Sequence, residues 1–198
     1  GDMERLSARL GQTDARTSES KWRQQVRDVI SSARSNGIHA TDLESMALQS
    51  VAELCAHLPA ATATDIEAPL IPAIETALSA ISGNGDETQT TARSLESLEQ
   101  ALSALRKRDF AWADWCRLAK LKAAKASQPH LAEVNQAASR VEEHPELRAD
   151  IETYITRIFR LAADALEIYQ DRKKARGMLD VTDLEVRTLD LLKRAHVR

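Results

Sequence analysis

The chain has 198 residues and a mass of 21.9 kDa, of which 43% of the residues are apolar, 29% charged and only 4% aromatic. This composition excludes collagen-like and low-complexity proteins, and no apolar run approaches the ~18 residues that a membrane span needs. The formal net charge is −3, so any nucleic-acid surface must be a local patch. Because glycine and proline are few, we predict an all-α fold: a multi-helix bundle or orthogonal array of about seven to nine helices.

In the first half of the chain, apolar residues recur at helical spacing and predict four helices. The first covers residues 20–35, and the second begins at Thr41 and ends before Pro59. A third stripe of apolar residues predicts a helix that starts near Pro72, because proline suits a first helical turn. The polar segment 83–91 is predicted to be a loop, and a fourth helix is expected to end at the basic run that starts with Arg106.

The second half predicts two short helices, one long helix and a final one. The short helices are expected over 110–125 and 130–143. Apolar residues at steps of three and four then predict a long helix near 146–176, bounded by Pro145 and Gly177. The last apolar pattern predicts a helix within 180–198, which ends without capping residues.

The chain lacks the sequence signatures of an enzyme. There is no phosphate-binding loop, no dinucleotide fingerprint, no zinc-protease motif and no nucleophile elbow. The five histidines share no metal-ligand spacing, so we expect no catalytic residue, metal or cofactor in this chain. Cys55 and Cys116 lie in apolar helical patterns and are expected to be buried free thiols in a reducing compartment. With no signal peptide and no membrane span, a cytoplasmic location is predicted.

One segment, 106–125, combines basic and aromatic residues and is a candidate DNA-contacting surface. It has seven basic residues against two acidic ones, a local net charge of +5, and its aromatic residues are Phe110, Trp112 and Trp115. Cations can neutralise phosphates, and an exposed aromatic ring can stack on a base. The alternative is that the aromatic residues face the core and the cations form a solvated face. The basic residues are Arg106, Lys107, Arg108, Arg117, Lys120, Lys122 and Lys125.

A second basic cluster lies at the end of the long helix and consists of Arg172, Lys173, Lys174 and Arg176. We include these four residues among the candidate DNA contacts. The alternative is that they stabilise the helix end, because cations favour the negative end of a helix dipole.

The residues around this second cluster resemble a motif of a known family. Segment 169–184 is similar to the Tyr-x(3)-Lys-x(3)-Gly-x-Leu-Asp-Phe-x-Asp-Leu segment of UvrD/Rep-type superfamily 1 helicases, which include the RecB and AddA helicase-nucleases. The departure is Val181, where the family usually has phenylalanine. The matching positions are Tyr169, Lys173, Gly177, Leu179, Asp180, Asp183 and Leu184.

The resemblance implies that the chain is part of a larger protein. In the family, this motif marks the return from the helical 1B subdomain to the first motor domain. It therefore implies a 1B-like insertion over 1–168, a return segment over 169–198, and ATP and magnesium sites elsewhere in the parent. The implied partners are duplex or forked DNA and the motor domains of the same polypeptide, with no membrane. The parent would be an ATP-dependent helicase, in some members with an exonuclease, and this part would not be catalytic.

The residues before Met3 also suggest an excised piece. Gly177 is expected to permit a sharp helix exit, Asp180 to cap the next helix, and Leu179 and Leu184 to pack on the motor domain.

The alternative function is a helical module that binds a protein partner through an apolar groove, and it predicts an exposed leucine and isoleucine patch with salt-insensitive binding. A self-contained enzyme is disfavoured by the missing motifs.

Overall fold

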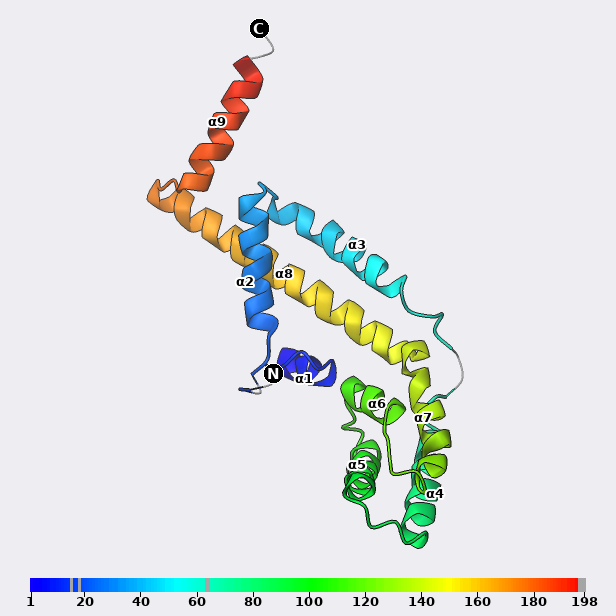
Figure 1. Cartoon of the computed structure of the whole chain (residues 1–198). Coiled ribbons are helices and arrows are strands. Elements are labelled where there is room, and N and C mark those ends of the chain that lie inside the picture. The colour runs from blue at the N-terminus through cyan, green and yellow to red at the C-terminus, as the bar shows by residue number, and fades with distance from the viewer. Residues whose placement is uncertain (15, 18, 63–64, 196–198) are drawn as a thin grey trace. The chain divides into compact units, whose positions relative to one another are not determined.

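Helices make up nearly all of the regular structure. The computed structural model describes residues 1–14, 16–17, 19–62 and 65–195, and within these there are nine α-helices, three short 3-10 helices and no β-strand (Figure 1). The all-α prediction is thus confirmed, together with the single long helix. The helices are α1 (Asp2–Arg9), α2 (Trp22–Ser35), α3 (Leu43–Cys55), α4 (Leu70–Gly83), α5 (Gln89–Arg106), α6 (Trp112–Ala119), α7 (Ala132–Ser139), α8 (Pro145–Arg176) and α9 (Val181–Ala195).

The chain forms two compact units that alternate along the sequence. The first unit contains residues 1–20 and 55–151, and the second contains residues 21–54 and the chain from 152 onward. The long helix α8 contributes its first turns to the first unit and the remainder to the second. The predicted division at 168/169, which refers to the parent protein, stays a prediction.

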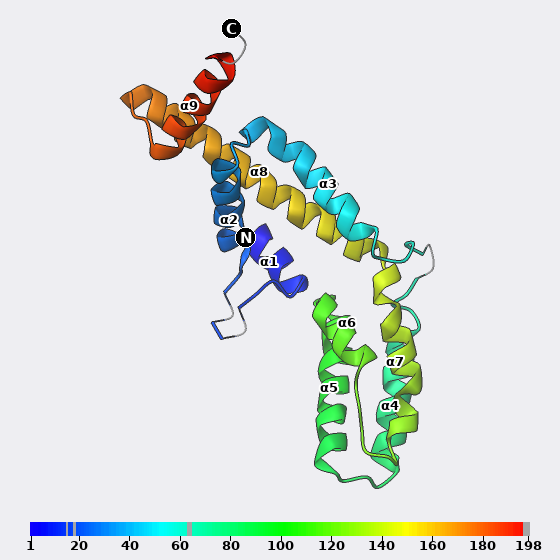
Figure 2. The ribbon, with the colours of Figure 1, turned by 45° about the horizontal axis from the view of Figure 1, so that its top comes forward.

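The first unit is built on α4 and α5, which lie side by side, with α6 and α7 packed against them (Figure 2). Their apolar faces form a core around Trp115, which is 1% exposed, and Ile74, which is fully buried. Leu10, which directly follows the unpredicted helix α1, packs against the same core. Other buried members of this core are Leu70, Leu98, Leu131 and Val134.

The second unit has a smaller core between α2, α3 and α8. Its buried members are Ala33, Leu43, Ala162 and Leu166. Partly buried side chains from α2 and α8, such as Ile30 and Phe159, complete it. Much of the apolar surface of this unit therefore stays in contact with solvent.

The segment 110–125 departs from the predicted single helix. Helix α6 ends at Ala119, and the chain continues without regular structure to residue 127. Side chains of neighbouring elements bind its backbone in place of helical hydrogen bonds: Asn135 Nδ2 donates to the carbonyl of Leu118 (2.7 Å), and Ser94 Oγ to that of Lys122 (2.7 Å). The helix predicted over 130–143 is likewise divided, with α7 between two 3-10 turns.

Two smaller expectations are also corrected. Cys116 is exposed and Cys55 only half-buried, because each lies on the outer side of its helix. Helix α4 begins at Leu70 rather than near Pro72, which lies in its first turn, where a missing N–H is tolerated. No helix in the described part of the chain has the length and apolar character to cross a membrane.

The α3–α4 connection is held by a side chain from a distant part of the sequence. The guanidinium of Arg148, on α8, donates to the carbonyl oxygens of Cys55 (3.4 Å) and Leu58 (2.9 Å) and to that of Pro59. These carbonyls lie at or just past the end of α3, where helix carbonyls lack partners of their own.

Asp86 organises the loop between α4 and α5. Its carboxylate accepts hydrogen bonds from the hydroxyls of Ser127 (2.6 Å) and Thr91 (2.8 Å) and from the backbone N–H of Thr88 (3.1 Å). These bonds, led by those of Ser127 and Thr91, lower the pKa of Asp86 from 3.8 to about 2. Ser127 and Thr91 are fully buried, so the carboxylate joins this loop to the core of the first unit.

The lowered pKa predicts an acid-dependent loss of stability. Because the folded protein holds the charged form of Asp86 more strongly, its contribution is complete above about pH 4 and disappears as pH falls toward about 2. We expect Asp86→Asn to lower the free energy of unfolding at pH 7. In this variant the free energy of unfolding should also fall less steeply between these two pH values. Urea denaturation at several pH values tests this, and parallel curves for the two proteins would contradict it.

Candidate functional site

The basic residues of segment 106–125 are all on the surface. Arg106 ends α5, Lys107 and Arg108 form the turn that follows, Arg117 lies on α6, and Lys120 comes directly after α6. Lys122 and Lys125 lie farther along the irregular segment and are exposed too. All seven side chains therefore face solvent, as a DNA-contacting surface requires.

Two of these cations already have acidic partners. Arg106 pairs with Glu75 (2.6 Å), and Arg117 pairs with Asp114 on its own helix (2.6 Å). No ion pair is found for the other five among the described residues. The cations without a carboxylate partner are Lys107, Arg108, Lys120, Lys122 and Lys125.

These cations are spread along α5 rather than gathered at one point. Lys122 lies beside Ser94, near the beginning of α5, through the hydrogen bond of Ser94 to its carbonyl. Arg106 lies 12 residues farther along the helix, which corresponds to about 18 Å. The arrangement is an elongated set of charges and not a compact anion pocket.

The aromatic residues of this segment are in the core. Trp112 is 5% exposed, Trp115 1% and Phe110 9%. The indole N–H of Trp112 donates to Asp150 (2.8 Å), and the guanidinium of Arg9 lies 4.6 Å from its ring centroid. The sequence allowed these aromatic residues either to contact DNA or to face the core. In this arrangement Trp112 has no free face on which a base could stack, so only the cations of this segment are available to contact DNA.

Arg108 has an unusual backbone conformation. Its φ is +55°, the only positive value at a non-glycine residue in the described part of the chain. The N–H of Arg108 donates to Leu105 and that of Asp109 to Ala104, which is a Schellman turn with arginine at the position where glycine is usual. The chain therefore keeps a strained, charged residue at the corner between α5 and α6.

The second basic cluster lies at the joint between α8 and α9. Gly177, with φ +60°, ends α8 in a Schellman turn, in which the N–H of Met178 donates to the carbonyl of Lys173 (3.0 Å). Asp180 and Asp183 then form a reciprocal cap: Asp180 accepts from the N–H of Asp183 (2.9 Å), and Asp183 from that of Asp180 (3.0 Å). The predicted helix exit at Gly177 and the predicted cap at Asp180 are both confirmed.

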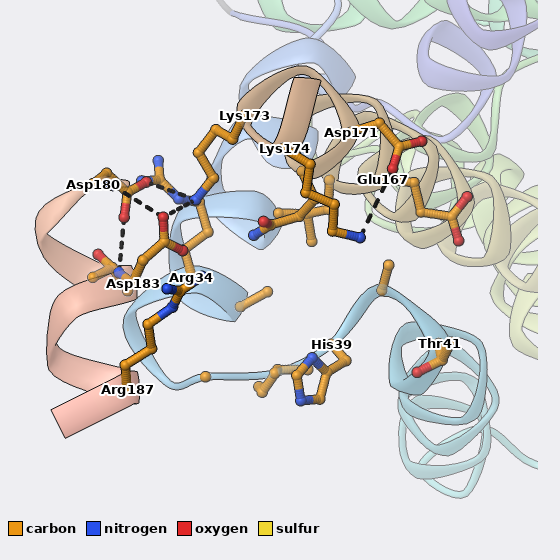
Figure 3. Close-up of a pocket in the computed structure, with 17 residues that line it drawn as sticks. Arg34, His39, Thr41, Glu167, Asp171, Lys173, Lys174, Asp180, Asp183 and Arg187 are labelled. Atoms are coloured by element: carbon orange, nitrogen blue, oxygen red, sulfur yellow. Dashed lines mark hydrogen bonds and ion pairs between the residues drawn. The ribbon is translucent and has the colours of Figure 1, made fainter. Parts of the chain in front are cut away.

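A cluster of charged side chains closes this joint, and Figure 3 shows it at the edge of a cavity. The ammonium of Lys173, a residue only 8% exposed, binds Asp183 (2.5 Å) and Asp180 (3.2 Å). Asp180 also accepts from the hydroxyl of Tyr169 (2.8 Å) and from Arg34 of α2 (2.8 Å). We refer to Arg34, Tyr169, Lys173, Asp180 and Asp183 as the joint cluster.

The electrostatics of the joint cluster favour the charged form of every ionisable member that shifts. Burial opposes the charge of Lys173, but its bonds to Asp183 and Asp180 outweigh this and raise its pKa. The pKa of Asp180 lies below its ordinary value because of the hydrogen bonds from the N–H of Asp183 and from Tyr169 and Lys173. The pKa of Asp183 is lowered mainly by Lys173. Both carboxylates are therefore ionised at neutral pH.

The joint cluster limits which basic residues of α8 are available to contact DNA. Lys173 is occupied by two carboxylates and has little exposed surface, so it is not available to phosphates in this arrangement. Arg172, Lys174 and Arg176 are exposed, and Lys174 has only a 4.0 Å contact with Asp171. Sequence reasoning did not identify Arg34, which lies 135 residues before Tyr169 and joins the cluster only through the fold.

Four members of the joint cluster, all except Tyr169, line a cavity of about 590 Å³ between the end of α2, α8 and the start of α9 (Figure 3). Its apolar wall includes Ala33, Ile38 and Leu166. The four cations and four carboxylates that line it balance each other, so the charges alone select no ligand. No metal-binding group of three or more acidic, histidine or cysteine side chains occurs among the described residues.

Comparisons with known proteins add no family assignment. No family model, curated protein or solved structure matches the chain.

Replacing Arg108 with glycine should stabilise the protein. Glycine adopts positive φ without the steric cost that arginine carries, but it also loses more conformational entropy on folding. The relief of strain is the larger effect, so we expect Arg108→Gly to raise the free energy of unfolding by about 0.5–1 kcal/mol. The matched control is Lys107→Gly, at a position with φ −85°, which should destabilise the protein. Urea denaturation measures both, and a loss of stability in Arg108→Gly would show that contacts of its side chain exceed the strain.

Removing Lys173 should loosen the start of α9. Lys173→Met leaves two carboxylates close together without their cation, so we expect amide exchange in the first turn of α9 to accelerate on the order of tenfold or more. Lys174→Met is the control, because Lys174 is exposed and barely paired. Hydrogen exchange with mass spectrometry measures this in both variants. Equal exchange rates in the two variants would refute a role of the joint cluster in holding the start of α9.

Proposed function

We propose that this chain is an accessory DNA-contacting region of an ATP-dependent DNA helicase of the UvrD/RecB/AddA type. In this proposal it holds and orients duplex or forked DNA against a motor that lies elsewhere in the parent protein. ATP and magnesium bind to that motor, and this chain has no catalytic residue. The observation that carries the DNA contact is a set of five exposed cations between Lys107 and Lys125 that form no ion pair with any described residue.

The joint cluster supports the family part of the proposal. Five of the seven matched motif positions have physical roles in one small structure: Gly177 makes the turn, Asp180 and Asp183 cap α9, and Lys173 and Tyr169 bind those carboxylates. A motif whose polar members depend on each other in this way is a structural unit, which is what the resemblance requires.

The chemistry of the proposed contact is phosphate binding without base reading. Lysine and arginine neutralise phosphates and release counterions, whereas base recognition needs polar groups or aromatic faces that reach the grooves or stacked bases. The tryptophans of this segment are buried. We therefore expect binding that depends on salt and on DNA shape but little on sequence.

Binding of a fluorescein-labelled fork to the 198-residue chain, followed by anisotropy over a series of salt concentrations, tests the proposal. We expect log affinity to fall linearly with log salt, and the triple variant Lys120→Ala, Lys122→Ala, Lys125→Ala to reduce the slope by about 2–3. The control removes the same charge from the second unit by changing the exposed Arg27, Arg157 and Arg160 to alanine.

The two variants separate a specific surface from general charge. Loss of affinity in the lysine variant alone supports the proposed surface. Equal losses in both variants, or no binding by the unaltered chain at low salt, would contradict it.

One observation favours a second candidate, a helical module that binds a protein partner. Large apolar side chains are exposed on and before α9, including Leu184 (53%) and Leu191 (66%). The resemblance expects Leu179 and Leu184 to meet a motor domain, and an interaction module needs the same kind of face. Such binding would not weaken with salt, which distinguishes it from phosphate contact.

A further inference from the structure

The exposed apolar residues of α9 form a stripe along one side of the helix. Val181, Leu184, Leu191 and Leu192 are 71, 53, 66 and 58% exposed. At 3.6 residues per turn they lie within about 100° of the helix circumference, in the positions of two successive heptads. Soluble proteins seldom leave a contiguous apolar stripe of this kind without a partner.

The polar residue in the middle of this stripe, Thr188, is compatible with an interface from which water is excluded. Thr188 takes the position between Leu184 and Leu191, and its hydroxyl donates to the carbonyl of Leu184 on its own helix (2.7 Å). The hydroxyl hydrogen therefore needs no water when the stripe is covered. Glu185 and Arg187 lie to either side of the stripe, where their charges can stay in solvent.

Two more exposed apolar residues lie in the joint directly before α9. Met178 and Leu179 are 57 and 48% exposed. At on the order of 100 Å² for each large aliphatic side chain, these two residues and the four leucine and valine residues of the stripe offer about 600 Å². Two such surfaces facing each other would bury about 1,200 Å², the lower end of the range for stable interfaces.

We propose that the α9 stripe is a homodimer interface, in which α9 of one copy packs against α9 of a second copy. A second copy has a stripe of the same length, width and apolar character, so a two-fold symmetric contact covers both stripes at once. The small area predicts a weak dimer with a Kd in the range of about 1–100 μM. The inference does not rest on DNA binding and uses none of the cations in segment 106–125. For Leu179 and Leu184 it takes the place of the motor-domain contact that the resemblance implies.

Sedimentation velocity of the 198-residue chain from about 1 to 300 μM, at low and at high salt, tests the proposal. We expect the mass to rise from monomer toward dimer over this range, with a Kd that high salt does not weaken. Leu184→Glu and Leu191→Glu should each weaken the dimer at least about tenfold. Circular dichroism verifies that these exposed changes leave the helical content intact.

Two matched controls make the outcome specific. Leu189→Glu is on the same helix and 55% exposed, but lies outside the stripe; Leu48→Glu is 57% exposed on α3. Neither control should change the Kd by more than about twofold. A monomer at all concentrations would overturn the proposal and leave the stripe to a different protein, and so would a dimer that the Leu48 change weakens as much as the α9 changes.

Discussion

The ammonium group of Lys173 fixes the direction in which α9 leaves the end of the longest helix. Gly177 makes the turn sterically easy, but a flexible exit fixes no direction for the helix that follows. The direction is set because one buried cation binds both carboxylates of the α9 cap. Removing either carboxylate would disturb the cap and the ion pair together, so the joint is stable only as a whole.

The same cluster explains why α2 belongs with the end of α8. Arg34 reaches Asp180 with its guanidinium 4.9 Å from the ring centroid of Tyr169, while Lys173 lies over the same ring. Three parts of the sequence thus meet at one carboxylate. The cluster thus adds a polar contact between α2 and the start of α9 to the small apolar core of the second unit.

Apolar periodicity predicted most helices well because helix formation is decided mainly by residues close in sequence. The limits of α2 and α8 and the cap at Asp180 follow from local patterns of this kind. The break after Ala119 does not, because it depends on Asn135 and Ser94 binding the backbone from other helices. The sequence left burial of Trp112 as one of two alternatives and gave no sign that Lys173 is buried, because the pattern does not show whether the partner of a side chain is Asp150, Asp180 or solvent.

The contact of Arg148 with the α3–α4 connection also bears on the order in which the chain folds. Its carbonyl partners lie about 90 residues earlier in the sequence. Closing a loop of this length is slow compared with forming a helix, so α3 can form long before the connection that follows it is fixed. A polypeptide emerging from the ribosome would carry this connection unsecured until the first turn of α8 had been synthesised.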